Sequence, residues 1–228
     1  MREVDLGSGE SRLVFHAFQK IGFPSFSKDG TRGAYLGADV AHPSDVWVTV
    51  PAFDRARQLT HLNPQIDRLP LSGLQRTVSW RSRSGSKTNG VVLLPSEYET
   101  GRRYPTIMYV YAGEQQGSET RTAFGAFGEQ RAGSYFNLQL LASRGYVVFI
   151  PNSTLRVGHP MEDIAGAVLP GLDKLVALGI ADPHRLGVFG QSYGGYSTMS
   201  LLVQTARFKA AVATSGIVDL VTSYATLQ

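Results

Sequence analysis

The sequence contains no cysteine among its 228 residues. This absence excludes disulfide frameworks, thiolate zinc sites and cysteine nucleophiles together. Charged residues are also few, at 18% of the chain against 43% hydrophobic and 10% aromatic residues, which is not the composition of a disordered segment. Because a core of ordinary size needs no disulfide, the missing cysteines leave the cellular compartment undetermined.

Long apolar runs and an excess of one charge are lacking as well. No stretch reaches the roughly 18 consecutive apolar residues of a membrane span, and residues 1–10 hold no apolar segment of a secretory signal. The 22 Lys and Arg against 18 Asp and Glu give a net charge of +4. These basic residues are dispersed, as on a solvated surface rather than in a nucleic-acid groove. Localisation and oligomeric state stay undetermined.

Residues 1–75 consist of short expected strands separated by turns. We expect strands at 23–27, 32–38 and 46–50, and the Asp29-Gly30 pair predicts a tight hairpin turn with both residues at positive φ. This unit has about the length of one propeller blade, roughly 40 to 45 residues. The alternative is a small β-meander packed on the domain that follows. The segment 60–75 is polar and contains prolines, as expected of a linker.

The rest of the chain, residues 76–228, alternates between strands and helices. The expected strands are 78–81, 90–95, 106–111, 146–151, 185–190 and 209–214, and the expected helices are 134–143, 162–178 and 196–204. This alternation predicts an α/β fold with a mostly parallel sheet and helices on both faces. Pro170 lies inside the second helix and is expected to kink it or split it in two.

A Gly-x-Ser-x-Gly motif marks the candidate catalytic residue. Residues 190–196 read Gly-Gln-Ser-Tyr-Gly-Gly-Tyr, with an apolar strand before them and a helix after them. This is the context of a nucleophile elbow, where Gly190 and Gly194 supply positions without side chains because the flanking elements nearly touch. The sequence therefore predicts that Ser192 is a nucleophile, raised out of the sheet at the positive end of a helix. The alternative is a glycine-rich turn in which Ser192 only caps the helix.

Residues 180–196, and the helix and strand at 136–148, resemble the prolyl oligopeptidase family of serine peptidases, which includes dipeptidyl peptidases and acylaminoacyl peptidases. The resemblance implies an α/β-hydrolase domain that follows a β-propeller. We therefore expect residues 1–75 to be a propeller remnant plus linker. Residues 76–228 would then be the N-terminal part of the hydrolase domain, truncated at its C-terminal end. The implied activity is hydrolysis of short peptides through an acyl-enzyme on Ser192.

Two tyrosines are expected to stabilise the oxyanion of this reaction. The residue after the nucleophile donates its backbone N–H, which points to Tyr193. The resemblance implies the hydroxyl of Tyr111 as the second donor, because a similar Tyr-Ala-Gly segment serves the dipeptidyl-peptidase-like branch; the alternative is an aromatic that packs at a strand end. It also implies that Tyr193 and Tyr224 line the substrate pocket, whose aromatic walls would suit proline or another compact apolar side chain.

The remaining members of a catalytic triad are not evident in the sequence. In this fold the serine is followed by an acid and then a histidine, but residues 193–228 contain no histidine and one acid, Asp219. We expect both partners to lie beyond residue 228, so that the chain alone hydrolyses peptides poorly. His159 is the least implausible substitute base. Asp219 is either an early acid or a surface or helix-capping residue.

No metal or cofactor is indicated, because the five histidines are scattered and no His-Glu-x-x-His motif is present. Two other functions stay open beside the peptidase. A carboxylesterase would use the same elbow with a different pocket, and a non-catalytic binding module can be built on the same fold. The sequence does not separate exopeptidase from endopeptidase action.

Overall fold

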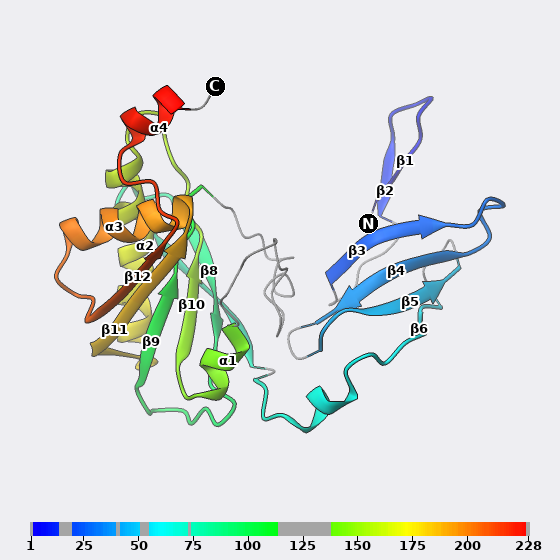
Figure 1. The fold of residues 1–228 in the computed structure, drawn as a ribbon, viewed down its shortest axis with the longest axis horizontal. Helices are drawn as coiled ribbons and strands as arrows, with labels where there is room; N and C mark the ends of the chain where they lie inside the picture. The colour runs from blue at the N-terminus through cyan, green and yellow to red at the C-terminus, as the bar shows by residue number, and fades with distance from the viewer. Residues whose placement is uncertain are drawn as a thin grey trace.

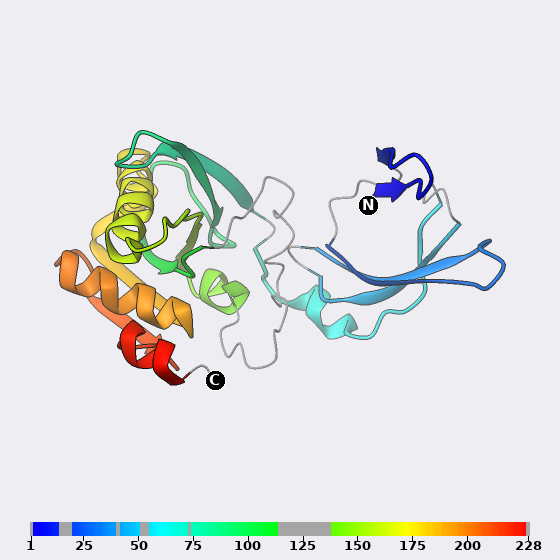
Figure 2. The ribbon, with the colours of Figure 1, turned by 90° about the horizontal axis from the view of Figure 1, so that it is seen from above.

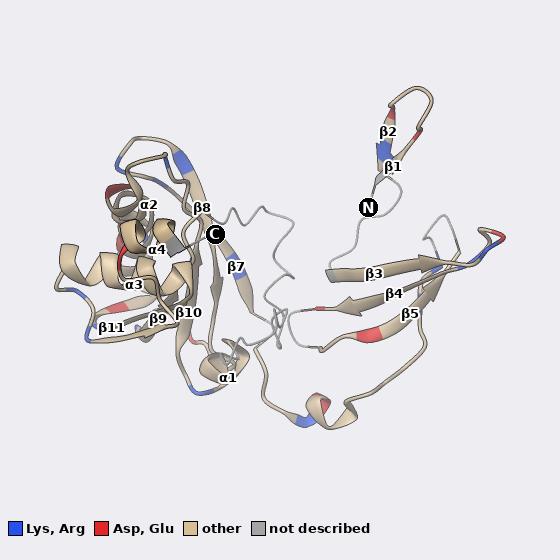
Figure 3. Ribbon diagram, turned by 45° about the horizontal axis from the view of Figure 1, so that its top comes forward, with Lys and Arg blue, Asp and Glu red and all other residues tan. Residues whose placement is uncertain are grey.

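The computed structural model describes residues 2–13, 20–39, 42–50, 55–72, 74–113 and 138–226. The fold is mixed α/β, with antiparallel sheets near the N-terminus and one six-stranded mixed sheet (Figure 1). The expected helix residues 134–137 lie outside the described ranges. Lys and Arg are dispersed along the described chain (Figure 3). None of the helices in these ranges combines the length and apolarity that crossing a bilayer requires.

Two antiparallel sheets form from the N-terminal part of the chain. A hairpin pairs β1 (Arg2–Val4) with β2 (Ser11–Leu13). The second sheet has the order β3-β4-β5-β6, and all its neighbours are antiparallel. Its strands are β3 (Lys20–Phe26), β4 (Gly33–Ala38), β5 (Asp45–Thr49) and β6 (Arg57–Gln58). The three predicted strands are confirmed, and β6 is a fourth that the sequence pattern did not indicate.

The turn between β3 and β4 differs from the predicted one. Ser27 N–H donates to the carbonyl of Arg32 at 2.9 Å, and Gly30 N–H donates to the carbonyl of Ser27 at 2.9 Å. Gly30 has φ +68°, whereas Asp29 is not at positive φ. The carboxylate of Asp29 instead accepts hydrogen bonds from the hydroxyl of Ser27 at 2.6 Å and from Thr31 N–H at 3.1 Å. The prediction was therefore wrong for Asp29, which shapes the turn through its side chain.

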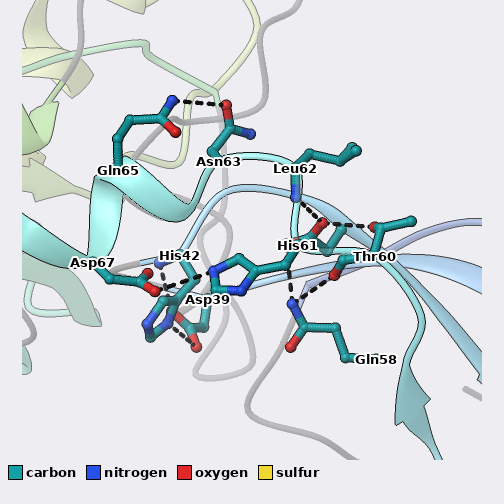
Figure 4. Close-up of polar contacts among 10 residues, drawn as sticks. Asp39, His42, Gln58, Thr60, His61, Leu62, Asn63, Gln65 and Asp67 are labelled. Carbon is teal, nitrogen blue, oxygen red and sulfur yellow. Dashed lines mark hydrogen bonds and ion pairs between the residues drawn. The ribbon is translucent and has the colours of Figure 1, made fainter.

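The linker contains one 3-10 helix, η1 (Pro64–Arg68), with no buried residue. The first residues of the linker, before η1, are held by Asp45 of β5, which is 5% exposed. The Asp45 carboxylate accepts hydrogen bonds from the Thr60 hydroxyl at 2.6 Å, Leu62 N–H at 2.9 Å and the Gln58 amide at 3.1 Å. Figure 4 shows Gln58, Thr60 and Leu62 of this cluster beside the contact between His61 Nε2 and Asp67 Oδ2, which are 3.1 Å apart.

The six-stranded sheet has the order β12-β11-β9-β10-β8-β7. Three neighbouring pairs are parallel, β12 with β11, β11 with β9 and β9 with β10, whereas β10–β8 and β8–β7 are antiparallel. The sheet is thus mixed, with its parallel part at the β12 side. Its strands are β7 (Gln75–Arg81), β8 (Lys87–Leu93), β9 (Tyr104–Tyr109), β10 (Val147–Pro151), β11 (Ala181–Gln191) and β12 (Ala210–Thr214).

Helices cover both faces of this sheet, as predicted. On one face, α1 (Leu138–Ser143) packs Leu138 and Ala142 against a small apolar cluster that includes Phe189. On the other face, α2 (Pro160–Ala177) and α3 (Tyr193–Gln204) cover the larger core (Figure 2). A short helix, α4 (Leu220–Thr226), follows β12. The helix predicted from residue 196 thus begins three residues earlier, directly after Ser192.

The helix α2 is continuous through Pro170, so the predicted split is wrong. A proline in a helix leaves the carbonyl four residues before it without its usual N–H donor. Here that carbonyl belongs to Gly166, and it accepts a hydrogen bond from the backbone N–H of Arg83 at 2.9 Å. The indole N–H of Trp80 donates to the next carbonyl, that of Ala167, at 2.8 Å. The β7–β8 hairpin therefore replaces the bond that Pro170 removes.

Candidate active site

Ser192 lies in the sharp turn between β11 and α3, as the motif predicts. Its backbone has φ 57° and ψ −122°, a conformation that costs a non-glycine residue about 1–3 kcal/mol. The turn is fixed from two sides: Ser192 N–H donates to the Thr214 carbonyl at 2.9 Å, and the Ser192 carbonyl accepts from Gly195 N–H at 2.9 Å. Ser192 is exposed, and its hydroxyl makes no hydrogen bond that caps α3. The helix-cap alternative therefore has no contact to support it.

The glycines around Ser192 are required by close backbone contacts. A Cβ at Gly190 would lie 2.3 Å from the carbonyl oxygen of Gly194, and a Cβ at Gly194 would lie 2.4 Å from the carbonyl oxygen of Val110. A Cβ at Gly195 would lie 2.6 Å from the Cα of Gly216. Backbone atoms cannot move aside as a flexible side chain can. The crowding predicted for the elbow is therefore present.

Tyr111 follows β9, which ends at Tyr109, so Tyr111 lies in the loop beyond the strand. Its ring centroid is 6.4 Å from that of Tyr193, with an angle of 56° between the ring planes. The side chain of Ser197 connects the two segments: its hydroxyl donates to the Tyr193 carbonyl at 2.8 Å and accepts from Ala112 N–H at 3.3 Å. The structure thus brings Tyr111 beside the start of α3, where the oxyanion role was predicted.

A groove with a volume of about 630 Å³ adjoins the elbow. Tyr193 and Tyr196 stack in its wall with ring centroids 5.2 Å apart. Burial raises the pKa of both phenols; proximity to Tyr196 raises that of Tyr193 further, and the charge of Glu162 raises that of Tyr196 further. The residues that line the groove are Leu155, Arg156, Val157, Gly158, Pro160, Met161, Glu162, Tyr193, Tyr196 and Leu220.

Sequence reasoning missed Tyr196 as a wall residue. The signal was available, because residues three apart on a helix share one face and Tyr196 follows Tyr193 at that spacing. Tyr224, predicted for the pocket, is 85% exposed on α4 and is not among the groove-lining residues. It lies one helical turn beyond Leu220, which does line the groove. The pocket role of Tyr224 stays a prediction.

Asp219 precedes α4 and caps it. Its carboxylate accepts hydrogen bonds from the Thr222 hydroxyl, from Val221 N–H at 3.0 Å and from Thr222 N–H at 3.1 Å. These bonds, led by that of the Thr222 hydroxyl, lower the pKa of Asp219 below its usual value. The helix-capping alternative is confirmed. His159 is exposed at the start of α2, and within the described ranges no hydrogen bond joins it to Ser192.

The described part of the chain contains no group of three His, Asp or Glu side chains placed to hold a metal ion. The groups that the structure does bring together are a strained serine, two tyrosines and an adjoining groove. This set provides a candidate nucleophile and hydrogen-bond donors for a developing oxyanion.

Comparison with known proteins places this chain in a family. Residues 160–228 match the model of the prolyl oligopeptidase family. Over 203 residues the chain is 30% identical to dipeptidyl-peptidase 5 of Porphyromonas gingivalis, an alignment that covers 82% of this chain and 28% of that protein. The acylaminoacyl peptidase of Pyrococcus horikoshii superposes with a TM-score of 0.70 and 25% identity, over 96% of this chain and 34% of that structure. The chain belongs to the prolyl oligopeptidase family.

Within the family the chain is related to dipeptidyl peptidases and to acylaminoacyl peptidases. Another relative, the uncharacterized peptidase YuxL of Bacillus subtilis, is 29% identical over 183 residues, covering 75% of this chain and 26% of that protein. The chain therefore spans between a quarter and a third of the length of the curated relatives named here.

Proposed function

We propose that this chain carries the nucleophile of a serine peptidase that hydrolyses short peptides. Membership of a serine peptidase family supports the reaction class, and the strained backbone of Ser192 at φ 57° is the observation that carries the proposal. In this reaction the Ser192 hydroxyl oxygen bonds to the peptide carbonyl carbon and its proton passes to a general base. The C–N bond then breaks, the amine leaves with a proton, and water later hydrolyses the acyl-enzyme.

The oxyanion of the tetrahedral intermediate would be held by Tyr193 and Tyr111. Tyr193 begins α3, and the N–H groups of the first helical turn have no partner within the helix. The Tyr111 ring lies 6.4 Å from that of Tyr193, which supports a hydroxyl donor from the second segment. The general base is not supplied by residues 193–228, since they contain no histidine.

The domain division belongs to the same proposal. The four-stranded antiparallel sheet between Lys20 and Gln58 supports a propeller blade within residues 1–75. The mixed sheet with helices on both faces, and the turn at Ser192, support an α/β-hydrolase domain within residues 76–228.

A fluorophosphonate probe tests the proposal, because it labels only an activated serine. Applied to the intact gene product, it should modify Ser192, as located by peptide mass spectrometry. Labelling should vanish in Ser192→Ala and persist in Ser84→Ala, which changes an exposed serine in the β7–β8 turn. An unlabelled intact product would indicate a non-catalytic binding module. Turnover of small esters without turnover of peptide amides would indicate a carboxylesterase.

A further inference from the structure

The groove beside the elbow combines apolar walls with a charged rim. Leu155, Met161 and Leu220 line it together with the stacked rings of Tyr193 and Tyr196. These residues come from the loop after β10, the start of α2, the start of α3 and α4. Since Tyr193 directly follows Ser192, a substrate side chain beside the attacked carbonyl has this groove within reach.

One rim charge, that of Arg156, is neutralised by Asp163, which does not itself line the groove. The guanidinium of Arg156 binds the carboxylate of Asp163 through Nη2 at 2.7 Å and through Nε at 3.1 Å. The backbone N–H of Arg156 donates to the same carboxylate at 2.7 Å. The side-chain hydrogen bond from Arg156 is the largest cause that lowers the pKa of Asp163, and the backbone hydrogen bond lowers it further. The same side-chain bond raises the pKa of Arg156. Arg156 and Asp163 thus form a closed ion pair with no net charge.

The other charged residue that lines the groove is Glu162, which is not part of the Arg156–Asp163 ion pair. It is exposed and lines the groove. Among the described residues it forms no ion pair and no hydrogen bond through its side chain. Its charge nevertheless reaches the phenol of Tyr196, whose pKa it raises in addition to the effect of burial. The charge of Glu162 also raises the pKa of Arg156, after the effects of Asp163, but Arg156 is bonded to Asp163, so these three side chains leave a net charge of one negative unit beside the aromatic wall.

We propose that this groove binds the side chain of a lysine or arginine residue of the substrate, with Glu162 as its counter-ion. The inference rests on the proposed peptidase function for calling the ligand a substrate. Long cationic side chains cover apolar surface with their methylene groups and keep the charge at the end. The apolar walls suit the methylene groups, and the tyrosine faces and Glu162 suit the cation. A bare ammonium group would leave these apolar walls uncovered.

The first experiment measures binding to the 228-residue chain and needs no turnover. Nα-acetyl-lysinamide and Nα-acetyl-norleucinamide differ in the cation, and each is titrated while the ring signals of Tyr193 and Tyr196 are followed by NMR. The lysine compound should shift these signals and bind about three- to five-fold more tightly, as one exposed charge pair provides. About 1 M NaCl should reduce the difference. Equal affinities, or ring signals that neither compound shifts, would contradict the proposal.

Two isosteric variants give the controls. Glu162→Gln should abolish the preference for lysinamide and leave norleucinamide binding unchanged, whereas Glu97→Gln, at an exposed site away from the groove, should keep the preference. A loss of the preference in both variants, or its persistence in Glu162→Gln, would overturn the role of Glu162. Unfolding curves of the variants verify that the fold is intact.

Hydrolysis by the intact gene product separates this inference from the proposed function. Fluorogenic peptides with lysine, norleucine or proline before the scissile bond should be cleaved with the highest kcat/KM for lysine. Cleavage that favours norleucine over lysine would refute the inference and leave the peptidase in place. If Ser192 stays unlabelled while lysinamide still binds through Glu162, the peptidase proposal fails and the cation-binding groove stands.

Discussion

At the scale of single residues, the elbow depends on backbone atoms that touch. A Cβ added at Gly194 would lie 2.4 Å from the Val110 carbonyl oxygen, which is a backbone atom. Ser192, at φ 57°, retains its strained conformation because β12 and α3 bind it from either side. An added methyl group at this contact has to push the loop that carries Tyr111 away from α3.

Gly194→Ala should therefore destabilise the chain by about 1–3 kcal/mol, the usual cost of overpacking a tight contact. Gly166→Ala is the matched control, because it also lies in a helix but its Cβ would come no closer than 3.6 Å to another atom, a Cβ of Arg83. A helical alanine there should be neutral or stabilise by about 0.5–1 kcal/mol. Thermal unfolding of both variants decides the point, and equal effects would contradict the crowding argument.

The elbow could be predicted from the sequence because its serine and its glycines lie in one heptapeptide between an apolar strand and a helix. The groove could not, since Leu155, Met161 and Leu220 come from separate segments and each is an ordinary apolar residue by itself. The pairing of Arg156 with Asp163 and not with the neighbouring Glu162 also depends on the folded loop after β10. Local motifs therefore located the candidate nucleophile, whereas the groove required the tertiary structure.

At the scale of elements, strand and helix alternation predicted the sheet and the helices on both faces. The local pattern was misleading at Pro170 in α2, where the β7–β8 turn supplies the N–H donor that the proline lacks. Pro170 predicts a kink or a split, but α2 is not split, and Arg83 N–H in the β7–β8 turn donates to the carbonyl of Gly166 at 2.9 Å. The rule for proline is local, and the compensating donor is far away in the sequence.

This bond can be removed without disturbing the turn that provides it. Gly85 N–H donates to the Ser82 carbonyl at 2.9 Å, so Arg83 is the second residue of a β-turn, where proline is favoured. Arg83→Pro removes the N–H that binds Gly166 and should cost about 1–3 kcal/mol, because a carbonyl loses its donor. Arg83→Ala keeps the N–H and should change stability by less than about 0.5 kcal/mol. Chemical denaturation compares them, and similar midpoints would contradict the role of this bond.

At the scale of the whole molecule, the linker is held at both ends. Near its C-terminal end, Gln139 of α1 accepts from Ser72 N–H at 2.9 Å and donates to the Ser72 carbonyl at 2.6 Å. At its start the anchor is the nearly buried Asp45 of β5, with Thr60 and Leu62 as donors. These contacts fix where the chain leaves the four-stranded sheet and where it joins the mixed sheet (Figure 1).

The anchor at Asp45 should respond to pH. Burial alone would raise the pKa of Asp45, but the hydrogen bonds from Thr60, Leu62 and Gln58 and the charge of His61 outweigh it and lower the pKa. A carboxyl group with a lowered pKa stabilises the fold above its unfolded pKa of about 3.9, and this contribution is lost as the pH falls through the folded value. The protection factors of the amides in residues 58–62, which compare each exchange rate with the intrinsic rate at the same pH, should therefore fall below about pH 4.

Two substitutions of Asp45 separate the effect of its negative charge from the effect of its hydrogen-bond acceptor. Asp45→Ala leaves Thr60 and Leu62 without their acceptor and should accelerate exchange in residues 58–62 at neutral pH, with a loss of about 1–3 kcal/mol. Asp45→Asn retains one oxygen, the atom type that both donors use, so its effect should be smaller, and its protection factors should not fall at acidic pH. If Asp45→Ala exchanges these amides as slowly as the unaltered chain, other contacts hold the linker, because loss of the nearly buried acceptor of Leu62 N–H should otherwise open that segment.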